Sequence, residues 1–266
     1  MNGRAFFVLS TGRCGTQTLS KLLQGAGNAV VWHHPEPDPI TEALAAWHGR
    51  LNRVEAFWRF RGPLIRKTWS QDKIHGETDM LMTPFADAIA AEIPQALFVV
   101  LVRNPWDFVR SGMRRGYYVD HGWDHGRLCP DEGDPLLETW RTWSPFTKVC
   151  WLWQQTYDRI EEMAGQISTH RVLKVRLEDL LSRPEACREL YDFLGLQGYD
   201  PERTQQILAV RHNVQVGGDF PTPEHWRSSQ LETLWQLCGL TARRWGYLEP
   251  GSLADIKRTF SPFKSS

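Results

Sequence analysis

A short apolar run, a glycine-rich turn and an amphipathic helix follow one another near the N-terminus. Ala5–Leu9 is a near-continuous apolar stretch, which is typical of a parallel β-strand that is buried on both faces. The turn STGRCGT occupies residues 10–16, and three leucines at helical spacing follow between residues 19 and 23. Backbone N–H groups at a helix N-terminus are unpaired and bind anions, and Gly12 and Gly15 would let a ligand approach them closely. This strand–turn–helix unit therefore predicts an anion-binding site.

Strand and helix patterns alternate along most of the remaining chain. Further strands are expected at 28–32, 74–79, 96–102 and 170–181 (the last a strand followed by a turn), and helices at 16–24, 40–60, 83–93, 146–164 and 184–195. Thr83 and Asn104, each followed by proline, are the expected N-caps of two helices. The alternation predicts an α/β fold of three layers, in which helices flank a parallel β-sheet.

We expect the whole chain, residues 1–266, to form one domain, because it contains no Gly/Ser tract, Pro-rich run or charge block that would serve as a linker. Residues 117–145 are rich in Gly, Pro, Asp, Tyr and Trp and have little periodicity, which predicts a long irregular loop or lid. From about residue 203 onward the chain is expected to be mainly helical.

Charge and cysteine content exclude several classes of function. Lysine plus arginine and aspartate plus glutamate balance at 31 each, so the overall charge favours neither a nucleic-acid nor a membrane partner. The five cysteines are scattered without a CxxC pair, which disfavours a structural zinc site and fits a reducing compartment. No apolar run approaches the roughly 20 residues that span a bilayer, and no signal peptide precedes the first strand. We therefore expect a cytoplasmic protein.

The turn after the first strand differs from the P-loop of nucleoside triphosphatases. That motif reads GxxxxGK[ST], whereas the residue five positions after Gly12 is Gln17 and no Gly-Lys pair follows. No acidic magnesium ligand accompanies the turn either. Both observations disfavour a P-loop-like nucleotide kinase, which is one of the functions we consider. Arg13 instead supplies a permanent charge and a forked set of donors that suits a tetrahedral oxyanion.

Ligands of open parallel sheets bind at the carboxyl ends of the strands. Three candidate sites lie at such ends: the turn at Gly12–Thr18, the pair His33 and His34 after the second strand, and Arg103 after the strand at 96–102. We expect them to meet at one edge of the sheet.

A second motif, VLVRNPWDFVRSGMRRGYY at residues 100–118, places Ser111 eight residues after Arg103. Together with the N-terminal turn and with VRLEDLLSRPEACRELYDFLGL at residues 175–196, it resembles the superfamily of sulfotransferases that use 3′-phosphoadenosine 5′-phosphosulfate (PAPS), in its bacterial and Golgi-type branch. The resemblance covers roughly residues 4–118 and 170–196. It implies a P-loop-like sulfotransferase fold and transfer of a sulfonate from PAPS, with 3′-phosphoadenosine 5′-phosphate (PAP) as product and no metal.

The resemblance also implies roles for individual residues. The 5′-phosphosulfate would be held by the N-terminal turn, namely Arg13, Cys14, Gly15, Thr16, Gln17 and Thr18, in which Cys14 is a small loop residue and not a nucleophile. Arg103 and Ser111 would hold the 3′-phosphate. Cytosolic members carry Arg-Lys-Gly-x-x-Gly-Asp-Trp near the C-terminus, whereas this chain has only VQVGGDFP at residues 214–221, so donor contacts from that segment stay open. Since Cys14 lies at a helix N-terminus near Arg13, we expect a lowered thiol pKa.

Transfer to a hydroxyl requires a base that removes the acceptor proton. In related enzymes a His or Glu follows the second strand or lies on a later strand, so the candidates here are His34, His33, Glu36 and Glu77. His34 is preferred because it takes the place of the glutamate in related His-Glu-Pro sequences, and a histidine has an unperturbed pKa of about 6.5. Arg13 would complete the catalytic set by neutralising charge on the transferred group.

The acceptor is expected to be a hydroxyl, or less commonly an amine, of a small molecule, a glycan or a natural product. Aromatic residues of the predicted lid would line its site: Tyr117, Tyr118, Trp123, Trp140 and Trp143. His121 and His125 have the spacing of a metal pair, but the adjacent glycines and the lack of a third ligand disfavour a metal site. A catalytically silent sulfotransferase-like binding protein is the remaining alternative, and it would follow if no candidate base faced the sulfonate.

Overall fold

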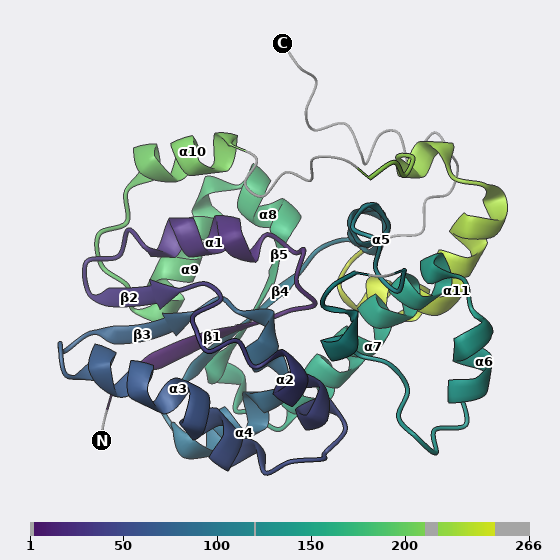
Figure 1. Cartoon of the computed structure of the whole chain (residues 1–266). Helices are drawn as coiled ribbons and strands as arrows, with labels where there is room; N and C mark the ends of the chain where they lie inside the picture. The colour runs from purple at the N-terminus through teal and green to yellow at the C-terminus, as the bar shows by residue number, and fades with distance from the viewer. Residues whose placement is uncertain (1–2, 120, 211–217, 248–266) are drawn as a thin grey trace.

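The computed structural model describes residues 3–119, 121–210 and 218–247. Within them lies a five-stranded sheet whose neighbouring strands are all parallel, in the order β2-β3-β1-β4-β5 (Figure 1). The strands are β1 (Ala5–Leu9), β2 (Ala29–Trp32), β3 (Ile74–Glu77), β4 (Leu97–Val102) and β5 (Val172–Arg176). Helices cover both faces of this sheet, so the predicted three-layer α/β fold is confirmed.

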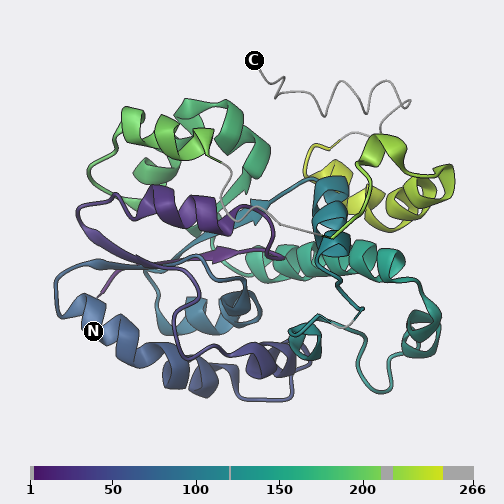
Figure 2. The ribbon, with the colours of Figure 1, turned by 45° about the horizontal axis from the view of Figure 1, so that its top comes forward.

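The helices form three groups (Figures 1 and 2). One face of the sheet carries α1 (Thr16–Leu23), α8 (Leu177–Ser182), α9 (Pro184–Leu194) and α10 (Pro201–Ala209), and the other carries α2 (Ile40–Trp47), α3 (Arg53–Trp69) and α4 (Ala86–Glu92). At the end of the sheet where the strands finish, α5 (Pro105–Arg114) and α11 (Ser228–Arg244) pack on the long α7 (Pro145–Gly165), with the short α6 (Leu137–Thr142) at the periphery.

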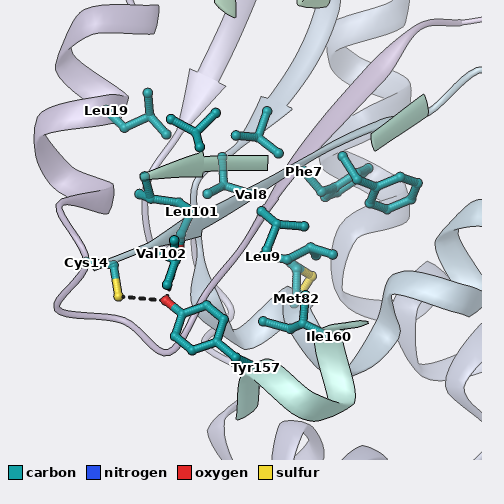
Figure 3. Packing of buried hydrophobic residues seen from close by; sticks show 14 of the residues in the cluster. Phe7, Val8, Leu9, Cys14, Leu19, Met82, Leu101, Val102, Tyr157 and Ile160 are labelled. Carbon is teal, nitrogen blue, oxygen red and sulfur yellow. Dashed lines mark hydrogen bonds between the residues drawn. The ribbon is translucent and has the colours of Figure 1, made fainter. Parts of the chain in front are cut away.

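β1 lies at the centre of the sheet and is buried along its whole length. It pairs with β3 on one side and β4 on the other, and Phe6, Phe7, Val8 and Leu9 are fully buried. Figure 3 shows side chains of β1 packed together with residues of β4 and α7. A strand covered on both faces needs an apolar side chain at every position, which is why its sequence was recognisable.

The predicted helix at 40–60 is in fact two helices. α2 ends at Trp47 and α3 begins at Arg53, because the side chain of Asn52 caps α3 by accepting hydrogen bonds from the amides of Val54 and Glu55 at 3.1 and 3.2 Å. The apolar periodicity continued across this break because Leu51, in the connection, packs against the same core.

The weakly predicted strand at 74–79 is an interior strand, β3, and all of its side chains are buried. Its sequence IHGE lacks an apolar pattern because two of its polar residues have buried partners. Glu77 is paired with the fully buried guanidinium of Arg61, which comes from α3, and His75 lies 3.5 Å from Glu77. Gly76 is required because a side chain there would overlap the ring of Phe6 on β1.

Thr83 is not the N-cap of the following helix, contrary to the sequence prediction. A short 3₁₀ helix, η1 (Met80–Phe85), precedes α4, and Asp79 caps η1 by accepting a hydrogen bond from the Leu81 amide at 3.0 Å. The Thr83 hydroxyl instead bonds the backbone of Ser10, donating to its carbonyl and accepting from its amide, both at 3.1 Å. The predicted N-cap Asn104 does cap α5, by accepting from the Asp107 amide at 2.8 Å.

Within its described residues, the predicted irregular segment 117–145 contains the 3₁₀ turn η2 (Asp124–Gly126) and the whole of α6, and its last residue, Pro145, begins α7. Further 3₁₀ turns are η3 (Thr169–Arg171) and η4 (Pro223–His225). The helical C-terminal part is represented by α10 and α11, whereas residues 214–217 of VQVGGDFP lie outside the described residues. Within the described ranges, no helix combines the length and the apolar character needed to cross a membrane.

Gly15 is the glycine of the N-terminal turn whose replacement tests the fold most directly. Its φ is +87°, and a Cβ atom there would lie 2.5 Å from Leu177 Cδ1 at the start of α8. We expect Gly15→Ala to lower the free energy of unfolding by about 1–3 kcal/mol in urea denaturation, because alanine resists a left-handed backbone and would push Leu177 aside. Gly27→Ala is the matched control, since no atom lies within 4 Å of its added Cβ; equal effects of the two substitutions would contradict this prediction.

Candidate functional site

The turn between β1 and α1 has the backbone of an anion cradle. Gly12, Arg13 and Gly15 all have positive φ values, of 72°, 54° and 87°. An ordinary residue followed by a left-handed one turns successive N–H groups toward one side, and Cys14 followed by Gly15 is such a pair. No side chain caps the N-terminus of α1. A non-glycine residue in this conformation is uncommon, so the conformation of Arg13 is held by its surroundings.

The two predicted anion-binding motifs are in direct contact. Arg13 Nε donates a hydrogen bond to Ser111 Oγ on α5 at 3.1 Å, although 98 positions separate the two residues. Arg103, which follows β4, donates from Nη1 to the carbonyl of Arg13 at 3.2 Å. Arg13, Arg103 and Ser111, which come from motifs far apart in the sequence, therefore form one cluster.

Arg103 is positioned through its backbone and its neighbours. Its carbonyl accepts a hydrogen bond from Trp153 Nε1 of α7 at 2.9 Å, and its guanidinium lies 3.5 Å from Asp107 Oδ2. Asn104, the next residue, donates to Glu178 Oε1 through both its amide and its side chain. The start of α5 is therefore fixed to α7 and to α8, and with it the place of Arg103.

The cluster has an excess of positive charge. Burial is the main factor that lowers the pKa of Arg13, and the neighbouring charges of Arg115 and then Arg103 lower it further. Arg115 belongs to the second motif but has no role assigned from the sequence, and the folded chain brings its charge close enough to act on Arg13. Three guanidinium groups close to a cradle of N–H groups suit a ligand with more than one negative charge.

The other residues of the turn differ in what they can offer a ligand. Thr16 is buried, and Gln17 and Thr18 are half-buried on the first turn of α1. Gln17 Oε1 is buried and has no hydrogen-bond partner among the described residues. A side chain at Gly12 would overlap the sulfur of Met80, so only glycine leaves this wall of the cradle intact. Gln17 Oε1 is an acceptor and cannot bind an anion, so the fit of the turn to an anionic group rests on its N–H groups and on the wall at Gly12.

Cys14 faces away from the cradle, and the expectation of a lowered thiol pKa is wrong. Its sulfur is fully buried and lies 2.9 Å from Thr11 Oγ1 and 3.1 Å from the hydroxyl of Tyr157 on α7 (Figure 3). Burial raises the pKa of the Cys14 thiol, and this effect outweighs the hydrogen bonds and the nearby arginine charge. Cys14 would therefore offer a ligand only its backbone N–H, while its thiol braces the turn by donating to the Gly12 carbonyl at 3.0 Å.

The two histidines after β2 have different surroundings. His33 Nδ1 lies 3.2 Å from the carbonyl of Thr78 and 3.1 Å from its hydroxyl, whereas His34 Nδ1 lies 3.1 Å from Asp79 Oδ1. Burial, and after it the charge of His34, lowers the pKa of His33. Burial alone would lower the pKa of His34 as well, but the hydrogen bond and charge of Asp79 outweigh it, so the pKa of His34 is raised. His34 also has a positive φ of 49°.

The histidine end of the site adjoins the anion cradle. Asp79 contacts His34, and the next residue, Met80, lies against Gly12 of the turn. The hydrogen bonds between Thr83 and Ser10 fasten this part of η1 to the end of β1. The ends of β1, β3 and β4 thus meet at one edge of the sheet, as predicted. His34 is connected to this edge by its contact with Asp79.

The alternative bases are less favourably placed. Glu77 is fully buried, and its carboxylate accepts a hydrogen bond from Arg61 Nε at 2.6 Å. Glu36 is exposed on the loop before α2. Neither position matches that of His34, whose side chain is 31% exposed at the edge of the cluster.

One group of side chains in the described residues has donor atoms close enough to share a cation. These atoms belong to His34, Asp38 and Asp79 and lie within 4.8 Å of one another. Arg61 Nη2, however, lies 3.2 Å from Asp79 Oδ2, so a metal ion would face a neighbouring guanidinium charge. The absence of a metal stays a prediction.

Residues 55–201, more than half of the chain, match the model of the sulfotransferase family. The chain belongs to this family. No curated protein matches it significantly.

Three solved structures resemble this sulfotransferase over most of its length. A sulfotransferase STF9 from Mycobacterium avium has a TM-score of 0.56 and 13% identity over 95% of this chain and 79% of its own. A sulfotransferase from Alicyclobacillus acidocaldarius has a TM-score of 0.52 and 14% identity over 92% and 94%. A sulfotransferase domain from the curacin biosynthetic pathway has a TM-score of 0.50 and 14% identity over 94% and 99%. At these identities the likeness concerns the fold, which is the expected sulfotransferase fold.

The aromatic residues expected in the lid of this sulfotransferase divide into two groups. Trp123 is 37% exposed and lies edge-on to the His34 ring, with centroids 5.7 Å apart. Tyr117 is buried beneath the guanidinium of Arg127, 3.4 Å from its ring, and Tyr118 donates to the Leu128 carbonyl. Trp140 and Trp143 pack against the core. Only Trp123 is therefore shown beside the candidate base.

The two histidines of segment 117–145, His121 and His125, have local partners. His121 Nδ1 accepts a hydrogen bond from the Trp123 amide at 3.1 Å, and His125 Nδ1 lies 3.0 Å from the Gly122 carbonyl.

The described end of the segment VQVGGDFP contacts α5, since Arg114 Nε donates to the carbonyl of Gly218 at 3.0 Å. This places residue 218 near the helix that carries Ser111.

The burial of Cys14 leads to a test by chemical modification. We expect iodoacetamide at pH 7.5 to leave Cys14 unmodified in the folded protein, because alkylation needs an accessible thiolate. Cys129, which is only half-buried, is the internal control and is expected to react first. Peptide mass spectrometry would measure both, and faster modification of Cys14 than of Cys129 would contradict the buried placement.

Proposed function

We propose that this sulfotransferase moves a sulfonate group from PAPS to a hydroxyl, or less commonly an amine, of its acceptor and releases PAP. The observation that carries the proposal is the contact of Arg13 with Ser111 and of Arg103 with the Arg13 carbonyl. These contacts bring the two anion-binding motifs into one site. A ligand with an anionic group at each end, such as PAPS, requires such a site.

Each part of the cluster has a function in holding the donor. The N–H groups of the turn and Arg13 bind the 5′-phosphosulfate, together with Gly15, Thr16, Gln17 and Thr18. Arg103 and Ser111 bind the 3′-phosphate, which distinguishes PAPS from ordinary adenylates. Because Arg13 contacts Ser111, its guanidinium is within reach of either anionic group. Arg115 adds positive charge to the same cluster.

The chemistry is an in-line displacement at sulfur, which resembles phosphoryl transfer. The acceptor oxygen forms a bond to sulfur while the bond from sulfur to the 5′-phosphate oxygen breaks, and the electron pair stays with PAP. Arg13 and the amides of the turn neutralise the charge that builds on the sulfonate and the leaving phosphate. The acceptor hydroxyl loses its proton to a base as it attacks.

His34 is the base that the surroundings favour. Its pKa is raised by Asp79, so the neutral ring is a stronger proton acceptor than that of His33, whose pKa is lowered. Its partly exposed edge lies beside Trp123, which would form one wall of the acceptor site.

The acceptor is a small molecule, a glycan or a natural product. One structural neighbour is a domain of the curacin biosynthetic pathway, which agrees with a natural-product acceptor for this fold. The balance of charges in the chain and its lack of a membrane-spanning pattern agree with a cytoplasmic enzyme.

Calorimetry with PAP and AMP tests the donor site. Arg103→Ala is expected to weaken PAP binding about 10- to 100-fold and AMP binding less than about 3-fold, because a charged hydrogen bond to the 3′-phosphate contributes roughly 1.5–3 kcal/mol. Arg59→Ala, which removes an exposed guanidinium on α3, is the control and should change neither affinity. If the unaltered protein binds PAP and AMP equally well, the 3′-phosphate assignment is wrong.

Replacing the base should affect turnover and not donor binding. His34→Ala is expected to lower kcat about 10²- to 10⁴-fold in an assay with radiolabelled PAPS and an acceptor library, while the Kd for PAP changes less than about 3-fold. His170→Ala is the control, because that exposed ring, which hydrogen-bonds Ser168, lies at the opposite end of the sheet. A larger loss in His33→Ala would move the role to His33, and transfer by neither the unaltered protein nor any variant would favour a silent binding protein.

A further inference from the structure

A fully buried group of charges lies directly behind His34. Arg61 Nε donates to Glu77 Oε1 at 2.6 Å, Nη2 donates to Asp79 Oδ2 at 3.2 Å, and Nη1 donates to the carbonyl of Pro37 at 2.8 Å. Arg61, Glu77 and Asp79 are all 0% exposed. Burying charges is costly unless each has close partners, so these contacts fix the three side chains in one arrangement.

This group also holds the loop that carries His34. Pro37 follows His34 by three residues, and its carbonyl is bound to Arg61. His34 itself has a left-handed backbone, with φ of 49°, which is uncommon for residues other than glycine. The ring is therefore directed by both the loop and the carboxylate that it contacts.

Asp79 makes a different contact with each part of its carboxylate. Oδ2 is bound by Arg61, whereas Oδ1 accepts from the Leu81 amide at 3.0 Å and lies 3.1 Å from His34 Nδ1. Leu81 and Arg61 alone would satisfy a carboxylate whose only task was to begin η1. The contact with His34 is additional: the buried Nδ1 lies at ion-pair distance from Asp79 Oδ1, although its orientation in this structure falls outside hydrogen-bond geometry.

We propose that Asp79 is a positioning residue for His34, which keeps the ring proton on Nδ1 and leaves Nε2 to take the proton of the acceptor. Arg61 holds Asp79 in place for this role. The inference rests on the proposed function, since it concerns the base of the sulfonate transfer. In the reaction the acceptor proton moves to Nε2, and Asp79 stays ionised and faces the resulting imidazolium.

The charges around His34 agree with this role. One guanidinium, Arg61, faces two carboxylates, Glu77 and Asp79, and the buried ring of His75 lies 3.5 Å from Glu77. The carboxylates favour the imidazolium that His34 becomes in the reaction. Burial raises the pKa of Asp79, but the hydrogen bond from His34, its charge, the Leu81 amide and Arg61 outweigh burial and keep the pKa below its usual value. Asp38 and Glu77 add to the raised pKa of His34, and the adjacent ring of His33, with its centroid 4.4 Å away, completes the titratable surroundings.

The unaltered protein provides the first test, because the ring ¹⁵N shifts of His34 report which nitrogen carries the proton. We expect the Nδ1–H form above the pKa of His34, and a pKa above about 6.5 in an NMR titration. The Nε2–H form, or a pKa below that value, would overturn the proposal. Neither measurement needs PAPS or an acceptor, so the result is independent of whether the protein transfers sulfonate.

Kinetics of a matched pair of variants provides the second test. Asp79→Asn keeps the shape of the side chain and removes its charge, so kcat should fall about 10²- to 10⁴-fold while the Kd for PAP changes less than about 3-fold. The acidic limb of the pH profile of kcat should move to lower pH, since loss of the carboxylate lowers the pKa of His34. Asp79→Glu is expected to recover part of the activity.

Glu77→Gln is the control for the cost of disturbing a buried ion pair. It removes the charge of the other carboxylate that Arg61 binds. Glu77 is as deeply buried as Asp79, but it makes no direct contact with His34. We expect it to destabilise the fold to a similar degree and to retain kcat within about 10-fold and the Nδ1–H form of His34. Equal losses of kcat in the Asp79 and Glu77 variants would reduce Asp79 to a structural residue.

Two further outcomes separate this inference from others. If the unaltered protein loses activity in a chelator and regains it with a divalent cation, His34, Asp38 and Asp79 are metal ligands and the proposal is wrong. If His34 has the expected tautomer and pKa but PAP does not bind, the proposed function fails while the pairing of His34 with Asp79 stands.

Discussion

The position of β1 between β3 and β4, with every strand parallel, determines where the functional residues lie. Parallel pairing directs all carboxyl ends to one edge of the sheet, so turns that are distant in the sequence become neighbours. Arg13 after β1 contacts Ser111 in the helix after β4, and Met80 after β3 contacts Gly12. Glu178 after β5 binds Asn104 beside Arg103. An antiparallel exchange of any one of these strands would place its turn at the opposite end.

Backbone strain is concentrated at the same edge. Among the described residues, four other than glycine have positive φ, and two of these are Arg13 and His34. Such conformations persist only where surrounding contacts over-determine them. For Arg13 these are Ser111 and Arg103, and for His34 they are Asp79 and the bond from Arg61 to the Pro37 carbonyl. The contacts that fix the backbone are thus made by the residues that we assign to the donor and to the base.

The sequence predicted the elements whose residues carry a local signal. β1 and β4 are apolar at every position, and Asn104 followed by proline predicts the start of α5. β3 was underestimated, because Glu77 is paired with Arg61, a partner from another element that no local pattern reveals. The break between α2 and α3 was missed for a similar reason, since Leu51 packs on the core although it lies outside a helix. Cys14 was misjudged because a helix N-terminus does not indicate which way a side chain points, and here it points toward Tyr157.

The site separates charge within a chain whose charges balance overall. Guanidinium groups gather at the cradle, where the charges of Arg115 and Arg103 act on Arg13, whereas behind His34 two carboxylates, Glu77 and Asp79, share one guanidinium, Arg61. In the proposed reaction negative charge moves from the acceptor oxygen toward the phosphate of PAP, and a proton moves the other way to His34. The cationic side receives the negative charge and the anionic side receives the proton. Since both fields are built into the folded chain, neither charge movement needs the surroundings to reorganise, which is the condition for electrostatic catalysis.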